Sequence, residues 1–143
     1  MTALLTETRG AIKILSINDA PINRMSLAFM DELEAEVARI AADDSIRAVV
    51  LTGDGDKNFS VGMDLKQLPE GIKQKGSAEA VFNQRLNVIR SIETMGKPWV
   101  ATLFGYCLGG GLELPLGCHF RLAAEEDAPV SYTHLTLPTK RIV

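Results

Sequence analysis

The sequence has few of the residues and patterns that mark secreted, membrane or metal-binding proteins. It has two cysteines in 143 residues, Cys107 and Cys118, and they lack the Cys-x-x-Cys spacing of zinc and redox sites. Their apolar or glycine-rich neighbours predict buried free thiols, which suit the reducing cytoplasm. The first ten residues, MTALLTETRG, have no basic flank before an apolar run, and no run is long enough to span a bilayer. We therefore expect a cytoplasmic protein that is neither secreted nor membrane-bound.

An excess of charge of one sign is also missing. Fifteen lysines and arginines face 18 acidic residues, so the formal net charge is −3, and the basic residues are scattered along the chain. Because nucleic acids and anionic membranes attract clustered positive charge, neither is expected as a partner. Hydrophobic residues make up 46% of the chain, enough for the buried core of one domain.

Several catalytic and cofactor motifs are absent from the sequence. It contains no GxxxxGK[ST] and no GxGxxG, which disfavours a nucleotide P-loop and weakens a dinucleotide-binding interpretation. It also has no GxSxG elbow and no cluster of histidines and cysteines with metal-ligand spacing, so no metal site is predicted. Of the two histidines, His119 is expected to be structural, and His134 receives no role.

The residues that are present alternate between strand and helix patterns. Strands are predicted over residues 11–17, 48–52, 99–103 and 120–124, and helices over 26–42, 77–95 and 112–116. Ser26 is the expected N-cap of the first helix, and the β-branched run AVVLT is expected to be buried on both faces. The polar segment LKQLPEGIKQKGS, residues 65–77, is interpreted as a mobile surface loop. The order of elements predicts an α/β fold.

Two glycine-containing turns follow predicted strands. In NFSVGMDL, residues 58–65, Gly62 would allow a sharp turn or a close approach and leave the N–H of Met63 pointing outward. In GYCLGGGLEL, residues 105–114, the glycines lie where a helix N-terminus presents unpaired N–H groups, a place that suits an anion. An ordinary turn is the competing interpretation for the first segment.

Together the two turns could aim the N–H groups of Met63 and Gly110 at one oxygen, which would form an oxyanion hole. Glu113 follows Gly110 by one helical turn, and its leucine neighbours predict a poorly solvated carboxyl group suited to proton transfer. A partner for the helix dipole is its alternative role. Asp64 could hold the turn or face the pocket, and Lys57 is expected to be a solvated loop residue rather than a contact for a distant phosphate.

NFSVGMDL and GYCLGGGLEL, together with KPWVA before the second segment and FRLAA after it, resemble the two signature regions of the enoyl-CoA hydratase/isomerase (crotonase) family. The resemblance extends over about residues 4–128. It implies a truncated crotonase-like (ClpP/crotonase) spiral of ββα units, with residues 1–128 as the N-terminal part of the domain. It also implies an acyl-CoA thioester as substrate, no cofactor apart from the substrate's own coenzyme A, and a full-length homotrimer or dimer of trimers.

The resemblance assigns roles to individual residues. The Met63 and Gly110 N–H groups would hold the thioester oxygen, and Glu113 matches one of the two glutamates with which hydratases handle water and the α-carbon proton. The backbone near Val61 would meet coenzyme A, and the loop after Leu65 would line the acyl pocket. The other residues assigned to substrate binding are Gly62, Asp64 and Gly109.

The end of the sequence departs from the family pattern. Hydratases carry their second glutamate shortly after the strand that matches FRLAA, where this chain has SYTHL, with Thr133 at the acid's position. SYTHLTLPTKRIV resembles a translated sequencing adapter, so residues 129–143 are interpreted as a non-native tail, with a genuine variant tail as the alternative. The predicted function of the parent is enoyl-CoA hydratase, a lyase, and the fragment itself is expected to be inactive. Another crotonase branch such as an isomerase, a catalytically dead acyl-CoA binder, and a nucleotide binder are the alternatives.

Overall fold

The computed structural model describes residues 2–125. The proposed tail, with Thr133 and His134, lies outside the described residues. The elements in chain order are β1 (Leu4–Arg9), β2 (Ile12–Ile17), β3 (Arg24–Met25), α1 (Leu27–Ala42), β4 (Ala48–Gly53), β5 (Gly62–Met63), the 3-10 helix η1 (Leu65–Gln67), α2 (Leu68–Lys75), α3 (Ala78–Glu93), β6 (Trp99–Leu103), α4 (Gly110–Leu116) and β7 (Phe120–Ala123). This succession confirms the predicted α/β class.

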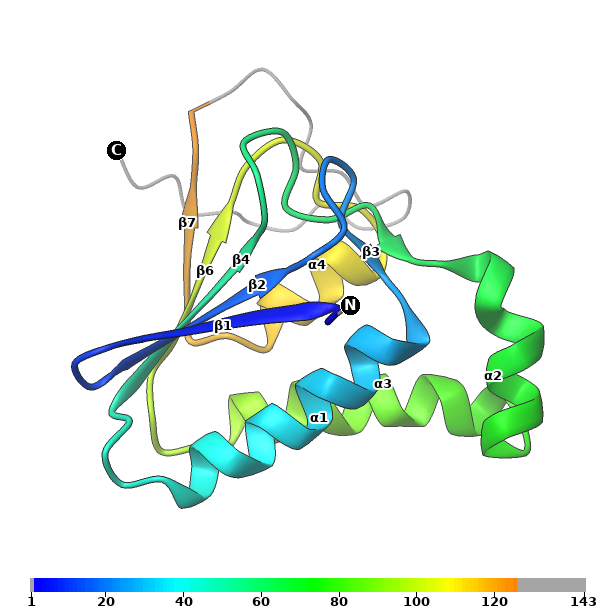
Figure 1. Ribbon diagram of the computed structural model, residues 1–143, viewed down its shortest axis with the longest axis horizontal. Coiled ribbons are helices and arrows are strands. Elements are labelled where there is room, and N and C mark those ends of the chain that lie inside the picture. The colour runs from blue at the N-terminus through cyan, green and yellow to red at the C-terminus, as the bar shows by residue number, and fades with distance from the viewer. Residues whose placement is uncertain (1, 126–143) are drawn as a thin grey trace.

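The strands form one large sheet and one small sheet. The large sheet has the order β1-β2-β4-β6-β7, in which β1 and β2 are an antiparallel hairpin and the other neighbours are parallel (Figure 1). The small sheet is the parallel pair β3-β5. The sequence analysis missed β1, because in LLTETR only Leu4 is buried and the remaining residues are exposed at the sheet edge. Right-handed crossovers of this parallel kind bring the carboxyl ends of β2, β4 and β6 to the same edge.

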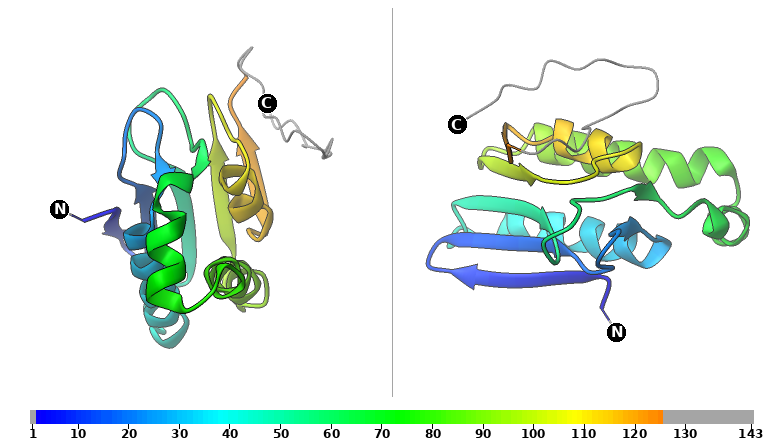
Figure 2. Two further views of the ribbon diagram at one scale, coloured as in Figure 1. Left: turned by 90° about the vertical axis from the view of Figure 1, so that its right-hand side faces the viewer. Right: turned by 90° about the horizontal axis from the view of Figure 1, so that it is seen from above.

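Helices α1 and α3 lie side by side against one face of the large sheet (Figures 1 and 2). That face carries fully buried residues in register, with Val49 of β4 beside Trp99 of β6 and Leu51 beside Ala101. The alternate residues of β4 are only partly buried, so the expectation that AVVLT is buried on both faces is wrong. Among the described residues, the helices that pack on β4 do so from one side, which produces the alternation.

Helix α1 confirms the amphipathic pattern and its predicted start. The Ser26 side chain accepts a hydrogen bond from the Phe29 N–H at 3.0 Å, which satisfies one of the donors that a helix start leaves unpaired. The helix buries one stripe at three- and four-residue spacing, made of Phe29, Leu33, Val37 and Ile40. Burying such a stripe orients α1 on the sheet and places the β3 turn that precedes it.

The expectation of a loop over residues 65–77 is wrong, because η1 and α2 occupy most of it. Pro69 stands in the first turn of α2, and Gly76 ends the helix in a left-handed conformation with φ 94°. Gly71 is buried where a Cβ would lie 2.9 Å from a Leu27 methyl group and 3.2 Å from one of Val81. Close packing on α1 and α3 therefore stabilises a helix whose own sequence is largely polar.

Strand β7 confirms the predicted strand in FRLAA, and it pairs with β6. Its side chains remain accessible, with Phe120 58% and Leu122 41% exposed. Large apolar side chains at a sheet edge favour association with further chain or with another molecule. None of the helices described in residues 2–125 combines the length and the apolar character that a membrane crossing requires.

Candidate active site

The two glycine turns predicted from the sequence lie next to each other. Beyond the ends of β4 and β6 their backbones continue as a pair: the Phe59 N–H donates to the Phe104 carbonyl at 2.8 Å and the Ser60 N–H to the Tyr106 carbonyl at 3.1 Å. The Leu108 N–H donates back to the Ser60 carbonyl at 3.0 Å. This parallel pairing carries residues 58–63 alongside the start of α4.

The N–H of Met63 faces the glycine run. Successive N–H groups of a strand point to opposite sides, and the next one, from Asp64, donates to the Met25 carbonyl of β3 at 3.3 Å. The Met63 N–H therefore points away from β3. A Cβ on Gly110 would lie 3.6 Å from the Met63 nitrogen, and a Cβ on Gly62 would lie 3.0 Å from the Gly110 nitrogen. The two amides border the same gap.

The N–H of Gly110 is also oriented by its turn. Gly109, at φ 53°, reverses the chain, and the N–H groups that follow Gly110 are used inside the turn. Gly111 donates to the Leu108 carbonyl at 2.8 Å, and Leu112 and Glu113 both donate to the Gly109 carbonyl at 3.0 Å. Gly110 is the first residue of α4, and within residues 2–125 no backbone carbonyl accepts from its N–H.

Residues without a Cβ atom are required where the two turns meet. Gly62 adopts φ 94°, and a Cβ there would lie 2.6 Å from the Leu108 carbonyl oxygen. A Cβ on Gly111 would lie 2.4 Å from the Ser60 carbonyl oxygen. Real Cβ atoms do not approach backbone oxygens so closely, so the glycines permit the close contact between the segments.

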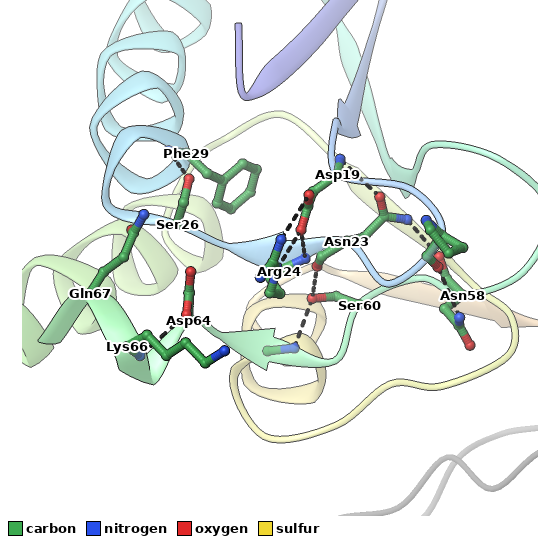
Figure 3. A network of polar contacts seen from close by, with 12 residues as sticks. Asp19, Asn23, Arg24, Ser26, Phe29, Asn58, Ser60, Asp64, Lys66 and Gln67 are labelled. Atoms are coloured by element: carbon green, nitrogen blue, oxygen red, sulfur yellow. Dashed lines mark hydrogen bonds and ion pairs between the residues drawn. The ribbon is translucent and has the colours of Figure 1, made fainter. Parts of the chain in front are cut away.

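A network of polar side chains stabilises the turn at Gly62 (Figure 3). The sequence analysis missed this network. Asn23 is fully buried at φ 53° and donates to the carbonyls of Asp54 at 2.9 Å and Asn58 at 2.7 Å. The Ser60 hydroxyl donates to the Asn23 carbonyl at 2.6 Å and accepts from the Gly62 N–H at 3.0 Å. Asn23 thus connects the segment before β3 to the turn that presents the Met63 amide.

We expect Asn23→Ala to lower the free energy of unfolding of the full-length protein by about 3 kcal/mol. The change removes two donated hydrogen bonds and the one accepted from the Asp19 N–H, each worth about 1 kcal/mol net. Alanine also tolerates the positive φ less well than asparagine. Denaturant titration measures the effect, and Asn83→Ala on the exposed face of α3 is the control. A loss below about 1 kcal/mol would contradict the assigned role of the network.

Glu113 has a partner that the sequence analysis did not identify. Arg85 of α3 lies with its Nη2 3.0 Å from Glu113 Oε2, and the two side chains are 14% and 25% exposed. The sequence analysis expected a poorly solvated carboxyl group between leucines, and the structure adds a guanidinium from another helix as its partner. The only sequence signal is a charged residue on the inner side of α3, next to the buried Gln84.

The remaining candidate residues occupy less central positions. Asp64 holds its turn, since its side chain accepts from the Lys66 N–H at 3.2 Å, and the Lys57 side chain is 70% exposed beside Asp56. The Val61 N–H donates to the Ile22 carbonyl at 3.0 Å, and Leu65 is 68% exposed.

The histidine and the thiols agree with their expected structural roles. His119 Nδ1 accepts from the Trp99 N–H at 2.9 Å, so this histidine ties β7 to β6. Cys107 and Cys118 are both buried, and burial raises the pKa of the Cys118 thiol to about 12. In the described part of the chain, no three His, Cys, Asp or Glu side chains are grouped as metal ligands would be.

A pocket with mainly apolar walls lies beside Met63, on the side of α1 and α2. Its lining residues are Met25, Ser26, Leu27, Met30, Met63, Asp64, Leu68, Val81 and Gln84. Leu68 belongs to the segment that the resemblance assigned to the acyl pocket, whereas Leu65 is not among the lining residues. Two neighbouring backbone amides therefore lie beside an apolar pocket wall, and Glu113 stands three residues after the second amide, in the first turn of α4.

Comparisons with known proteins give consistent results. The family model described as enoyl-CoA hydratase/isomerase matches residues 12–129. A Bacillus subtilis protein named "Probable enoyl-CoA hydratase" is 31% identical over 137 residues, which are 96% of this chain and 52% of the relative. A short-chain-enoyl-CoA hydratase of Clostridium acetobutylicum is 29% identical, over 85% of this chain and 46% of its own length. The solved enoyl-CoA hydratase of Bacillus anthracis superposes with a TM-score of 0.75 at 30% identity, over 86% of this chain and 48% of that one. The chain thus spans about half the length of these relatives.

Proposed function

Because the chain belongs to the enoyl-CoA hydratase/isomerase family, we propose that it supplies the oxyanion-stabilising side of an active site for acyl-CoA thioesters. The whole protein then hydrates 2-enoyl-CoA. The observation that carries this proposal is that the Met63 and Gly110 amides border one gap and that Glu113 follows one helical turn later. The names of the relatives from Bacillus subtilis and Clostridium acetobutylicum support the choice of hydration.

In the proposed reaction the two N–H groups donate to the thioester carbonyl oxygen. A general base takes one proton from a water molecule as its oxygen adds to C3, the C2–C3 π electrons move toward the carbonyl, and the resulting enolate oxygen carries the negative charge. The same hydrogen bonds then strengthen, because preorganised donors act on charge as it develops, and each is worth about 3 kcal/mol in the transition state. C2 finally takes a proton, and the carbonyl is restored. Glu113 is either the general base that takes the proton from the water or the general acid that protonates C2.

We infer the remaining features of the whole protein from the family. Residues 1–128 form the N-terminal part of a crotonase-like domain, and residues 129–143 are a non-native tail. Val61, Gly62, Asp64, Leu65 and Gly109 contribute to substrate binding through their backbone and the pocket wall. The enzyme works in the cytoplasm as a homotrimer or dimer of trimers, without a cofactor other than the coenzyme A of its substrate.

A second candidate function is acyl-CoA binding without hydration. It applies if residues 129–143 are a genuine variant tail, because Thr133 of SYTHL then stands where hydratases have their second glutamate. An oxyanion hole that binds only the ground state of the substrate does not accelerate the chemical step. Isomerisation of an enoyl-CoA is the third possibility, since it uses the same enolate-like intermediate with a different placement of the acid and base.

Calorimetric titration and a turnover assay separate these functions. We expect the full-length protein to bind butyryl-CoA, a saturated thioester that cannot be hydrated, and to consume crotonyl-CoA with loss of its enoyl absorbance. Binding without consumption would support the second candidate. Conversion of a 3-enoyl-CoA to a 2-enoyl-CoA without net water addition would support the third. A protein that neither binds nor converts these thioesters would refute the proposal.

A further inference from the structure

We propose that Arg85 is a positioning residue, which orients the Glu113 carboxylate toward the gap bordered by the Met63 and Gly110 amides. This inference rests on the proposed function and adds a residue to it. It begins from the contact between Arg85 Nη2 and Glu113 Oε2 at 3.0 Å, which joins the middle of α3 to the first turn of α4.

The guanidinium lies at the site itself. A Cβ on Gly110 would be 3.5 Å from Arg85 Nη1 and 3.6 Å from the Met63 nitrogen. Arg85 and the two amides therefore lie around the same small region, and the Glu113 carboxylate contacts the guanidinium. Since Gly110 has no side chain, nothing from that residue separates the guanidinium from the amides.

The surroundings of Arg85 restrict its movement. Its guanidinium carbon lies 5.5 Å from the centre of the Phe82 ring, one turn earlier on the same helix, and its side chain is 14% exposed. A guanidinium fixed in this way limits the rotations of the flexible Glu113 side chain.

Stability alone does not account for this arginine. Its Nε is buried without a hydrogen-bond partner among the residues that the structure describes. A buried donor left unpaired carries a desolvation cost, and a buried ion pair is often no more stable than apolar residues of the same volume. An arginine retained under these conditions is better explained by its effect on Glu113 than by its contribution to folding.

The test compares Arg85→Met and Arg85→Lys in the full-length enzyme. We expect Arg85→Met to lower kcat for crotonyl-CoA hydration by about 10- to 100-fold, a part of the 10²- to 10⁴-fold effect typical of a positioned acid or base. KM should change by less than about threefold, because the amides and the pocket wall are intact. Arg85→Lys should recover most of the activity, since a lysine ammonium can supply the contact that Nη2 makes with the Glu113 carboxylate. Arg90→Met, at an exposed position of the same helix, should leave kcat unchanged.

A double mutant shows whether Arg85 acts through Glu113. In an enzyme that already carries Glu113→Gln, Arg85→Met should cause no further loss, because the group that it positions is gone. A loss of equal size in both backgrounds, or a kcat within twofold of the wild type in Arg85→Met, would overturn the inference. Thermal melting of each variant identifies any loss that comes from unfolding, and if Arg85→Met is unfolded, Arg85→Gln takes its place with the same expected loss of kcat at unchanged KM.

The outcomes also separate this inference from the proposed function. A wild-type enzyme that does not hydrate crotonyl-CoA refutes the function and the role of Arg85 together. A wild-type enzyme that hydrates it, and loses the activity in Glu113→Gln but keeps it in Arg85→Met, refutes the role of Arg85 alone.

Discussion

Replacing Glu113 with glutamine in the full-length enzyme should lower kcat for crotonyl-CoA hydration by about 10³-fold or more. The amide has nearly the same shape as the carboxyl group but can neither take up nor release a proton at working pH, so general acid–base assistance worth 10²- to 10⁴-fold is lost. The Kd for butyryl-CoA should stay within about threefold, because the amides of Met63 and Gly110 and the pocket wall do not change. Steady-state hydration kinetics and calorimetric titration measure the two quantities.

The control for this experiment is Glu79→Gln on the exposed surface of α3, which should match the wild type in both measurements. Turnover retained in Glu113→Gln would remove Glu113 from its assigned role. A combined loss of turnover and binding would mean that the carboxylate, through its contact with Arg85, organises the pocket rather than the chemistry.

Replacing Gly62 with alanine should destabilise the full-length protein by about 3 to 5 kcal/mol and remove hydration activity. Left-handed backbone costs an alanine about 1 to 2 kcal/mol, and the added methyl group would meet the Leu108 carbonyl oxygen at 2.6 Å. Forcing an atom into such a contact typically costs another 1 to 3 kcal/mol, because the paired segments must separate. Their separation moves the Met63 and Gly110 amides apart, so the substrate oxygen can reach only one of them.

Gly76→Ala is a matched control, because Gly76 has the same φ of 94° but no atom within 4 Å of the position of its Cβ. Gly76→Ala should lower the free energy of unfolding only by the cost of the backbone conformation, about 1 to 2 kcal/mol, and should keep the hydration activity. Denaturant titration and the hydration assay, applied to both variants, separate the cost of the left-handed backbone from the cost of the steric contact. Equal destabilisation by the two substitutions would show that the Gly62 contact is not tight in solution.

Periodic segments were predictable from the sequence. The apolar stripe of α1 has the three- and four-residue spacing of a helix, the short β-branched run of β4 is typical of a strand, and Ser26 marks a helix start. Helix α2 was not predictable in this way, since its polar composition resembles a loop. Contacts of the buried Gly71 with α1 and α3 decide its structure, and these contacts are not visible in a local pattern.

The candidate site was predictable in its backbone and less so in its side chains. Glycines at residues 62 and 109–111 indicate backbone that must turn or pack closely, so the approach of the Met63 and Gly110 amides followed from residue type. Arg85 and Asn23 act on Glu113 and Gly62 from distant parts of the chain. Neither has a local spacing that distinguishes it from an ordinary surface arginine or turn asparagine, so only the tertiary structure identifies them.

The pairing of residues 58–63 with residues 104–108 has a consequence for how the site comes into existence. The two amides belong to residues 63 and 110, far apart in sequence, and the parallel backbone bonds made by Ser60 bring them together. Neither glycine segment, as an isolated peptide, carries both donors. Assembly of the donor pair therefore waits for long-range chain closure, one of the slow, entropy-limited events of folding. The proposed oxyanion hole is therefore a property of the completed topology, and we expect it to be lost cooperatively when that topology unfolds.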